Sequence, residues 1–516
     1  MVDDRHAEKR RLARNAILST MAWVFPIVLG FVTTPILVKG LGTEQYGIFA
    51  VVLGFLTYSF TFGIGKVVAK FIPEFNAAGE TGKIPGAIAA TFWFSLTVGL
   101  LGAVVLALLA PRIVSDLLLI PPESQYTATV ALYLACGIAL VMMLCQVFQY
   151  SLQGLHRFDS YVLLTSFYGI MLGAGNIVLV INGFGIEALF GWNLITACVA
   201  TLLFFIQAKR VVPDLSFALP ADRSISRSVV RYGGNIILFQ VFGNALLIFE
   251  RTWVMRKFGP EAVTFYFVPM LLAVNMQALV ASAVQAVFPV VNELLNDKAR
   301  LARLYQKSTK IILAVVVFIC TVFISSGSSF LTLWINAELA ANSYQLLVLH
   351  TLTFGLVALL IIPLQLAEAS NFSSLTAVAT GTWLLIAAPL MILTADQWQS
   401  EGIAASRLFA VAVTMPLIFF VEKRFLGSVF GNFWLSNGIR ILLAAIAAGT
   451  VIFQILMRFP ASWITLAGAV AVGGLIFVAA LQITGYLSRD EKQLIRELLP
   501  FRRRSFTGAS DWDNKE

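Results

Sequence analysis

The chain has 516 residues, of which 59% are hydrophobic and only 12% are charged, and its formal net charge at pH 7 is +9. Soluble domains carry roughly 25% charged residues and about 45–50% apolar ones. Because apolar runs recur along nearly the whole chain, this composition excludes an ordinary soluble protein. A bilayer core about 30 Å thick needs roughly 20 apolar residues for each helical crossing. The composition therefore predicts an all-α polytopic membrane protein.

Fourteen apolar segments follow one another, and each is long enough for one crossing. The first follows the basic N-terminus without an A-x-A cleavage signal, which indicates a retained helix and not a signal peptide. An even number of spans places both termini on the same side of the membrane. The segments lie at about 16–38, 46–65, 86–110, 128–153, 160–181, 185–208, 229–255, 263–292, 309–334, 343–368, 372–395, 402–422, 437–457 and 462–487.

The Lys and Arg residues divide unevenly between the two sides of this arrangement. With the N-terminus inside, 29 of the 36 fall in inward segments, six fall in outward segments, and Arg407 falls within a span. An excess of Lys and Arg marks cytoplasmic loops. We therefore expect a multi-pass protein of the bacterial inner membrane with both termini in the cytoplasm. The placement of the charges also argues against a nucleic-acid partner.

The loops between spans are too short to hold a soluble domain, which usually needs 50 residues or more. An attached ATPase or glycosyltransferase domain is therefore excluded. The tail has capping-box spacing from Ser488 to Glu491 and predicts either a short helix on the anionic leaflet or a frayed basic end. The expected units are an N-terminal six-helix lobe at 1–208, a basic cytoplasmic linker at 209–228, a C-terminal six-helix lobe at 229–424, two additional transmembrane helices at 425–487 and a basic cytoplasmic tail at 488–516.

A weak internal repeat relates the two lobes. Asn15 and Asn235, near the starts of spans one and seven, are 220 residues apart. Gly42 and Gly259, each followed two residues later by Glu, are 217 residues apart. Since six spans form an even number, both units would enter the membrane in the same direction. Parallel six-helix repeats are a transporter architecture with the substrate path between the lobes.

No motif indicates covalent chemistry. The segment 77–84 has Ala77 and Ile84 where a phosphate-binding loop needs Gly and Ser or Thr. The three histidines, His6, His156 and His350, are too scattered for a zinc site. We therefore expect neither enzymatic activity nor a cofactor or metal.

Ionisable residues within the spans cost at least roughly 2.5–3.5 kcal/mol each at a helix centre, so they usually face a cavity or a partner. A polar vestibule on each side suits alternating access, in which two lobes rock about a shared site. Two alternatives stay open: a glutamate that neutralises an arginine, or arginines that snorkel outward. The candidates for the substrate path are Glu187, Glu250, Arg251 and Arg407 toward the outer half, and Lys66 and Glu368 toward the inner mouth.

Span seven carries a polar stripe. At about 100° per residue, Gln240, Asn244 and Arg251 lie within roughly 40° of one another. Such a stripe is costly against lipid, so we expect it at the lobe interface. Arginine can pair bidentately with phosphate oxygens, which favours an anionic substrate. Glu250 lies about 100° from Arg251 and is therefore better placed to meet a neighbouring helix.

Three stretches near span ends form a recognisable pattern. They are Lys39-Gly-Leu-Gly-Thr-Glu-Gln-Tyr-Gly after Pro26 and Pro35, the second-span exit at 61–72, and the seventh-span exit with Glu250-Arg251 and Phe258-Gly-Pro-Glu. This pattern resembles the Wzx-type polysaccharide flippases of the multidrug/oligosaccharidyl-lipid/polysaccharide exporter superfamily. An acidic residue, often Asp in that family, is here Glu250. Pro26 and Pro35 are expected to bend span one between the lobes during gating.

The resemblance implies a flippase that moves a polyprenyl-pyrophosphate-linked oligosaccharide for cell-surface polysaccharides such as O-antigen or exopolysaccharide. It implies as partners this lipid-linked substrate, membrane lipids and a polysaccharide polymerase. A cation-coupled multidrug exporter of the same superfamily is one alternative, although it would favour an acidic cavity. A lipid II flippase is another, and the sequence does not separate it from the first interpretation. An integral-membrane glycosyltransferase or polymerase would need larger outer loops.

Overall fold

The computed structural model describes residues 2–60, 63–218, 223–285, 291, 294–295, 297–370, 372 and 374–486. For residues 2–26, 57–60 and a few positions between 235 and 285 it describes the backbone alone. Within these ranges every regular element is helical, as predicted. The elements are α1 (Val2–Phe60), α2 (Gly65–Ala77), η1 (Thr81–Lys83), α3 (Ile84–Arg112), η2 (Ile113–Leu117), α4 (Pro122–Gly154), α5 (Phe158–Ile181), α6 (Ile186–Val211), α7 (Arg223–Gln285), α9 (Lys298–Trp334), α10 (Ala337–Ala369), α11 (Ser374–Val413), α12 (Leu417–Val421), η3 (Glu422–Leu426), α13 (Gly431–Arg458) and α14 (Trp463–Ile483).

The long helices account for the predicted spans. Eleven stretches of the described chain are long and apolar enough to cross a membrane. Three of them contain a non-helical break, at Gly42 in α1, at Gly259 in α7 and at Trp398–Gln399 in α11. Each of the fourteen predicted segments lies wholly or mostly on one of these helices. A helix satisfies its backbone groups internally, as a segment surrounded by lipid must. The prediction of a polytopic all-α membrane protein is confirmed.

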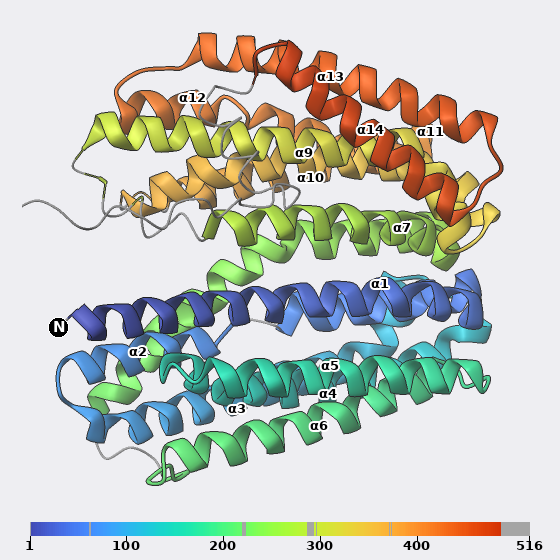
Figure 1. Ribbon diagram of the computed structural model, residues 1–516. Coiled ribbons are helices and arrows are strands. Elements are labelled where there is room, and N and C mark those ends of the chain that lie inside the picture. The colour runs from blue at the N-terminus through green and yellow to red at the C-terminus, as the bar shows by residue number, and fades with distance from the viewer. Residues whose placement is uncertain are drawn as a thin grey trace, which may run out of the picture.

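The helices form two groups that lie side by side in Figure 1. We call α1–α6 the first bundle, and α9–α14 together with most of α7 the second bundle. One apolar cluster of buried side chains lies within the first bundle, two lie within the second, and the largest joins both. We call the end of the molecule that carries Gly42 and Gly259 the kink end. The opposite end, where 212–218 follow α6, is the linker end.

Gly42 and Gly259 give the internal repeat a structural form. Their φ angles are 80° and 81°, and their ψ angles are 165° and −177°. Only glycine adopts this conformation readily, because it has no Cβ. At each glycine one long helix ends and the chain continues as another. The two glycines that the sequence pairs at a spacing of 217 thus make the same break in the two bundles.

The start of α7 packs against the first bundle. Nζ of Lys70 lies 4.4 Å from the ring centroid of Tyr232, and the rings of Phe71 and Tyr232 are 6.3 Å apart. Gly233 faces the ring of Phe94. Helix α7 therefore begins against α2 and α3 and continues into the second bundle (Figure 1). The lobe boundaries at 208 and 228 stay a prediction, and the predicted tail helix after Ser488 lies outside the described residues.

Candidate functional site

The two bundles meet closely at the kink end. The hydroxyl of Thr264 donates a hydrogen bond of 2.6 Å to the carbonyl oxygen of Thr43. A Cβ added to Gly47 would lie 1.8 Å from the carbonyl oxygen of Pro260, so the two backbones touch here. These contacts join residues just after Gly42 to residues just after Gly259. The repeated breaks of the two bundles therefore form the contact that closes this end.

Arg251 lies in the same seam, two helical turns before Gly259. Its guanidinium donates a hydrogen bond of 2.6 Å to the carbonyl oxygen of Ala50 in the first bundle. Its Cζ lies 4.1 Å from the ring centroid of Phe267. A Cβ on Gly54 would lie 2.5 Å from Cδ of the arginine, so this glycine leaves the space that the arginine fills. The guanidinium thus reaches from α7 onto the backbone of α1.

Glu250, the neighbouring residue, points into the second bundle. Its carboxylate is completely buried and accepts hydrogen bonds from the guanidinium of Arg407 and the hydroxyl of Tyr266. Arg407 is itself only 7% exposed, and its Cζ lies 4.9 Å from the ring centroid of Phe354. The ring of His350 packs edge-on against Tyr266 with centroids 4.6 Å apart. We call Glu250, Tyr266, His350, Phe354 and Arg407 the buried ion-pair cluster.

The buried ion-pair cluster and Arg251 differ in what they can do. In the cluster one carboxylate neutralises one guanidinium inside a single bundle, where an uncompensated charge would be costly. This is the ion-pairing alternative that the sequence left open for Glu250. Arg251 instead lies between the bundles, on the backbone of α1. The two adjacent residues point apart because successive helical residues are rotated by about 100°.

The remaining candidates fall in separate places. Asn244 is buried and Gln240 half-buried on the first limb of α7. The carboxylate of Glu187, at the start of α6, accepts a hydrogen bond of 2.5 Å from the hydroxyl of Thr127.

Two further candidates belong to the linker end. Lys66 is exposed at the start of α2, and Glu368 is exposed at the end of α10. The role of these two side chains and of Glu187 in a substrate path stays a prediction.

Pro35 leaves a backbone carbonyl of α1 free for a contact that no sequence pattern predicts. Because proline has no N–H, the carbonyl oxygen of Phe31, four residues earlier, lacks its usual helical donor. The indole N–H of Trp334 donates to this oxygen over 3.0 Å, and the rings of Phe31 and Trp334 stack with centroids 5.1 Å apart. The α1 break itself lies at Gly42, whereas bending at Pro26 and Pro35 during gating stays a prediction.

The amino-acid sequence matches a known protein family. The pattern of the family described as polysaccharide biosynthesis protein matches residues 12–295, which is more than half of the chain. The chain belongs to this family. The resemblance to the Wzx-type flippases of the larger exporter superfamily is thereby confirmed.

Two curated relatives of this polysaccharide biosynthesis family member are named as transport proteins. A putative O-antigen transporter of Shigella flexneri is 22% identical over 437 residues, which are 82% of this chain and 100% of the relative. The succinoglycan biosynthesis transport protein ExoT of Rhizobium meliloti (strain 1021) is 22% identical over 308 residues, which are 58% of each chain.

The fold is shared with solved structures of a flippase and of a multidrug transporter. The lipid II flippase MurJ in an inward closed conformation has a TM-score of 0.73 at 14% identity, covering 93% of this chain and 100% of that one. An inward-facing multidrug resistance transporter of the MATE family has a TM-score of 0.63 at 13% identity, covering 78% and 96%. At these identities the likeness concerns the fold alone.

The structure also reveals a second buried carboxylate that the sequence analysis of this family member missed. Glu422, in η3, is completely buried. It accepts hydrogen bonds from the hydroxyl of Tyr305 (3.1 Å), the indole N–H of Trp434 (2.7 Å) and the backbone N–H of Phe430 (2.9 Å). The contacts join α9, η3 and the start of α13. In the sequence Glu422 stands beside Lys423 and Arg424. Such a run of charged residues indicates a solvent-exposed loop and gives no signal of a buried carboxylate.

Proposed function

We propose that this protein translocates a polyprenyl-pyrophosphate-linked oligosaccharide across the bacterial inner membrane for cell-surface polysaccharide biosynthesis. The pyrophosphate and sugars would cross between the two bundles, while the polyprenyl chain stays in lipid. A charged head group is strongly disfavoured in hydrocarbon. The protein would therefore provide polar groups that take the place of water around the head group while it crosses. No covalent step is required, so we propose a transporter and not an enzyme. A polysaccharide polymerase is the proposed partner that receives the translocated product.

The position of Arg251 carries this proposal. A guanidinium lies in the seam between the bundles, over Gly54 and on the carbonyl oxygen of Ala50. When the bundles part at the kink end, this contact with α1 is broken and the planar fork faces the opened path. Guanidinium groups bind phosphate oxygens bidentately, whereas an ammonium acts as a point charge. An arginine released by opening therefore suits a diphosphate carried through the seam.

Alternating access follows from the same contacts. At the kink end the bundles are joined through Thr43, Gly47 and Thr264. At the linker end the start of α7, with Tyr232, packs against Lys70 of the first bundle. Rocking of the two bundles about a central path would open these kink-end contacts while it brings the bundles together at the linker end. A multidrug exporter for cations is less well supported, because the buried Glu250 is already neutralised by Arg407.

Replacement of Arg251 tests the proposal directly. We expect Arg251→Ala to slow translocation by about 10- to 100-fold, because a hydrogen bond to a charged group contributes about 1.5–3 kcal/mol. Arg251→Lys should be impaired as well, since lysine lacks the fork. The assay uses proteoliposomes containing a fluorescent polyprenyl-diphosphate disaccharide. Dithionite added outside quenches the fluorophore in the outer leaflet only, so the rate of fluorescence loss measures translocation. The same assay with a labelled lipid II separates the two flippase substrates.

Arg458→Ala is the matched control for this experiment. It removes an exposed arginine at the end of α13, a helix that packs against α9 and α14 of the second bundle. Translocation by this variant should stay near the wild-type rate. Full activity of folded Arg251→Ala protein would contradict the diphosphate contact. Loss of stability in Arg251→Ala with full rescue by Arg251→Lys would assign the residue a packing role only.

Orientation in the inner membrane is part of the proposal and has its own test. Reporter fusions after Gly183, Asn336 and Asp396 are expected to report the periplasm, and fusions after Asp222, Asp297 and Glu516 the cytoplasm. Nζ of Lys257, two residues before the Gly259 break, lies 2.9 Å from a carboxylate oxygen of Asp396, so Asp396 belongs to the kink end. A cytoplasmic signal at Asn336 would refute the fourteen-span arrangement.

A further inference from the structure

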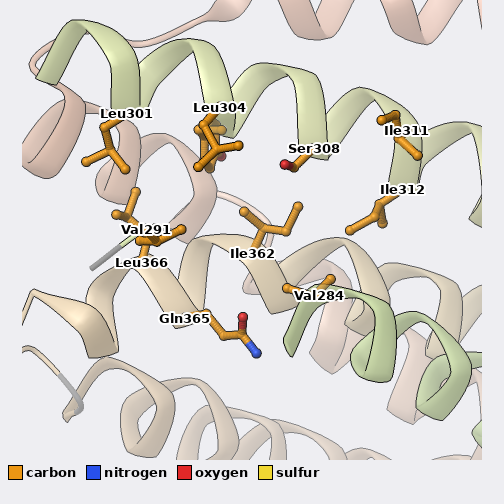
Figure 2. A pocket seen from close by; sticks show the side chains of 11 residues that line it. Val284, Val291, Leu301, Leu304, Ser308, Ile311, Ile312, Ile362, Gln365 and Leu366 are labelled. Carbon is orange, nitrogen blue, oxygen red and sulfur yellow. The ribbon is translucent and has the colours of Figure 1, made fainter. Parts of the chain in front are cut away.

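A cavity in the second bundle lies apart from the seam. Its volume is about 150 Å³, and Figure 2 shows Leu304 and Ser308 of α9 projecting into it opposite Ile362 of α10. Val284 near the end of α7 closes another side. Among the residues that the structure describes, those that line it all belong to α7, α9, α10 and position 291. The cavity therefore belongs to the side of the second bundle and not to the path between the bundles.

The walls of the cavity are apolar and partly fixed. Most lining side chains are aliphatic, with Tyr305, Ser308 and Gln365 as the polar exceptions. The hydroxyl of Tyr305 already donates to the buried Glu422, so this wall is held in place from behind. An apolar space loses contact energy when nothing fills it. In a protein surrounded by lipid, hydrocarbon chains are the matching occupant.

The cavity opens to the outside of the molecule beside α9. Ile311, one of the lining residues, is 53% exposed, and Val315, one turn further, is 43% exposed. Such exposure of aliphatic side chains on a membrane helix marks a face in contact with lipid. A chain from the bilayer can therefore enter past Ile311.

A cationic stripe runs beside this mouth. Arg303 and Lys307 are exposed on α9, and at about 100° per residue they lie within about 40° of each other. Leu304 and Ile311 lie within about 60° of Lys307 on the same helix. The stripe lies in the second and third turns of α9. Phosphate and hydrocarbon sites are thus adjacent on one helix.

We propose that this cavity binds one acyl chain of a resident anionic phospholipid, with the lipid phosphate at Arg303 and Lys307. Anionic headgroups are attracted to such basic clusters at the membrane surface. The occupant is a resident phospholipid and not the transported lipid, because none of the described residues that line the cavity belongs to the first bundle. The site is independent of the proposed translocation path and would serve to anchor the start of α9 against α10.

Lipid retention by the purified full-length protein tests the site. After reconstitution in vesicles of phosphatidylglycerol and phosphatidylcholine, native mass spectrometry is expected to show selective retention of phosphatidylglycerol. Arg303→Gln/Lys307→Gln should weaken this retention about thirtyfold, since each basic residue near an anionic surface contributes about a fivefold gain. Ser308→Phe fills the cavity and Ile311→Trp blocks its mouth, and both should remove the retained lipid.

Matched variants control for charge and size. Arg112→Gln/Arg458→Gln removes two exposed cations at the kink end, and Val315→Phe enlarges a side chain on the same face of α9 outside the cavity. Both should retain phosphatidylglycerol as the wild type does. Unchanged retention in folded Ser308→Phe and Ile311→Trp proteins would overturn the cavity site. Equal retention of phosphatidylcholine would overturn the proposed contact between the lipid phosphate and the two basic residues. Displacement by equimolar undecaprenyl phosphate would overturn the proposal that the occupant is a resident phospholipid.

Discussion

Gly47→Leu is expected to abolish translocation while leaving the two bundles folded. A Cβ at this position would lie 1.8 Å from the carbonyl oxygen of Pro260, which is backbone and cannot rotate away. Overpacking of a tight contact costs about 1–3 kcal/mol or more, so the closed state of the kink end should lose on the order of 100-fold in population. Because the clash lies between bundles, each bundle can keep its own packing. The protein would then remain open at this end.

Two measurements check this prediction. Translocation is followed in the proteoliposome assay, and opening is followed by alkylation of Thr264→Cys, whose native side chain is fully buried, in a background without the four native cysteines. We expect the Gly47→Leu protein to lose activity and to be alkylated faster. Gly191→Leu is the control, since a Cβ there meets nothing within 4 Å. Normal translocation by Gly47→Leu would show that closure at this contact is not required.

Glu250→Ala and Arg407→Ala are each expected to destabilise the second bundle by about 3–5 kcal/mol. Either change leaves the opposite charge buried without its partner, and that penalty exceeds the worth of the pair itself. The double variant Glu250→Leu/Arg407→Met should recover most of the lost stability, because it removes both buried charges and preserves volume. Thermal unfolding in detergent, followed by fluorescence-detected size-exclusion chromatography, ranks the variants by stability.

The exposed pair of Lys257 and Asp396 serves as the control for this experiment. The carboxylate side chain of Asp396 is 73% exposed, so Asp396→Ala should cost about 1 kcal/mol or less. Translocation by the double variant separates structure from transport. Recovery of stability together with activity would assign Glu250 and Arg407 to the scaffold alone, whereas recovery of stability without activity would return them to the proposed path.

The hydrophobic pattern alone determined the class of protein and the positions of its helices. A membrane leaves few solutions, because each crossing has a set length and must satisfy its backbone internally. The glycine pair at 42 and 259 was visible as a repeat, and the same local conformation requires glycine in both bundles. The prediction that Glu250 and Arg251 point to different neighbours rests on helical geometry, and the observed contacts agree with it.

Only the tertiary structure decided which groups meet. Glu250 and Arg407 are 157 positions apart, and Trp334 reaches Phe31 over 303 positions. No periodicity encodes such pairs, since they depend on how helices pack against one another and not on any one helix. The same holds for Glu422, which stands beside two basic residues in the chain and yet lies buried under Trp434. Local patterns fix where a side chain points on its helix, whereas packing decides what it touches.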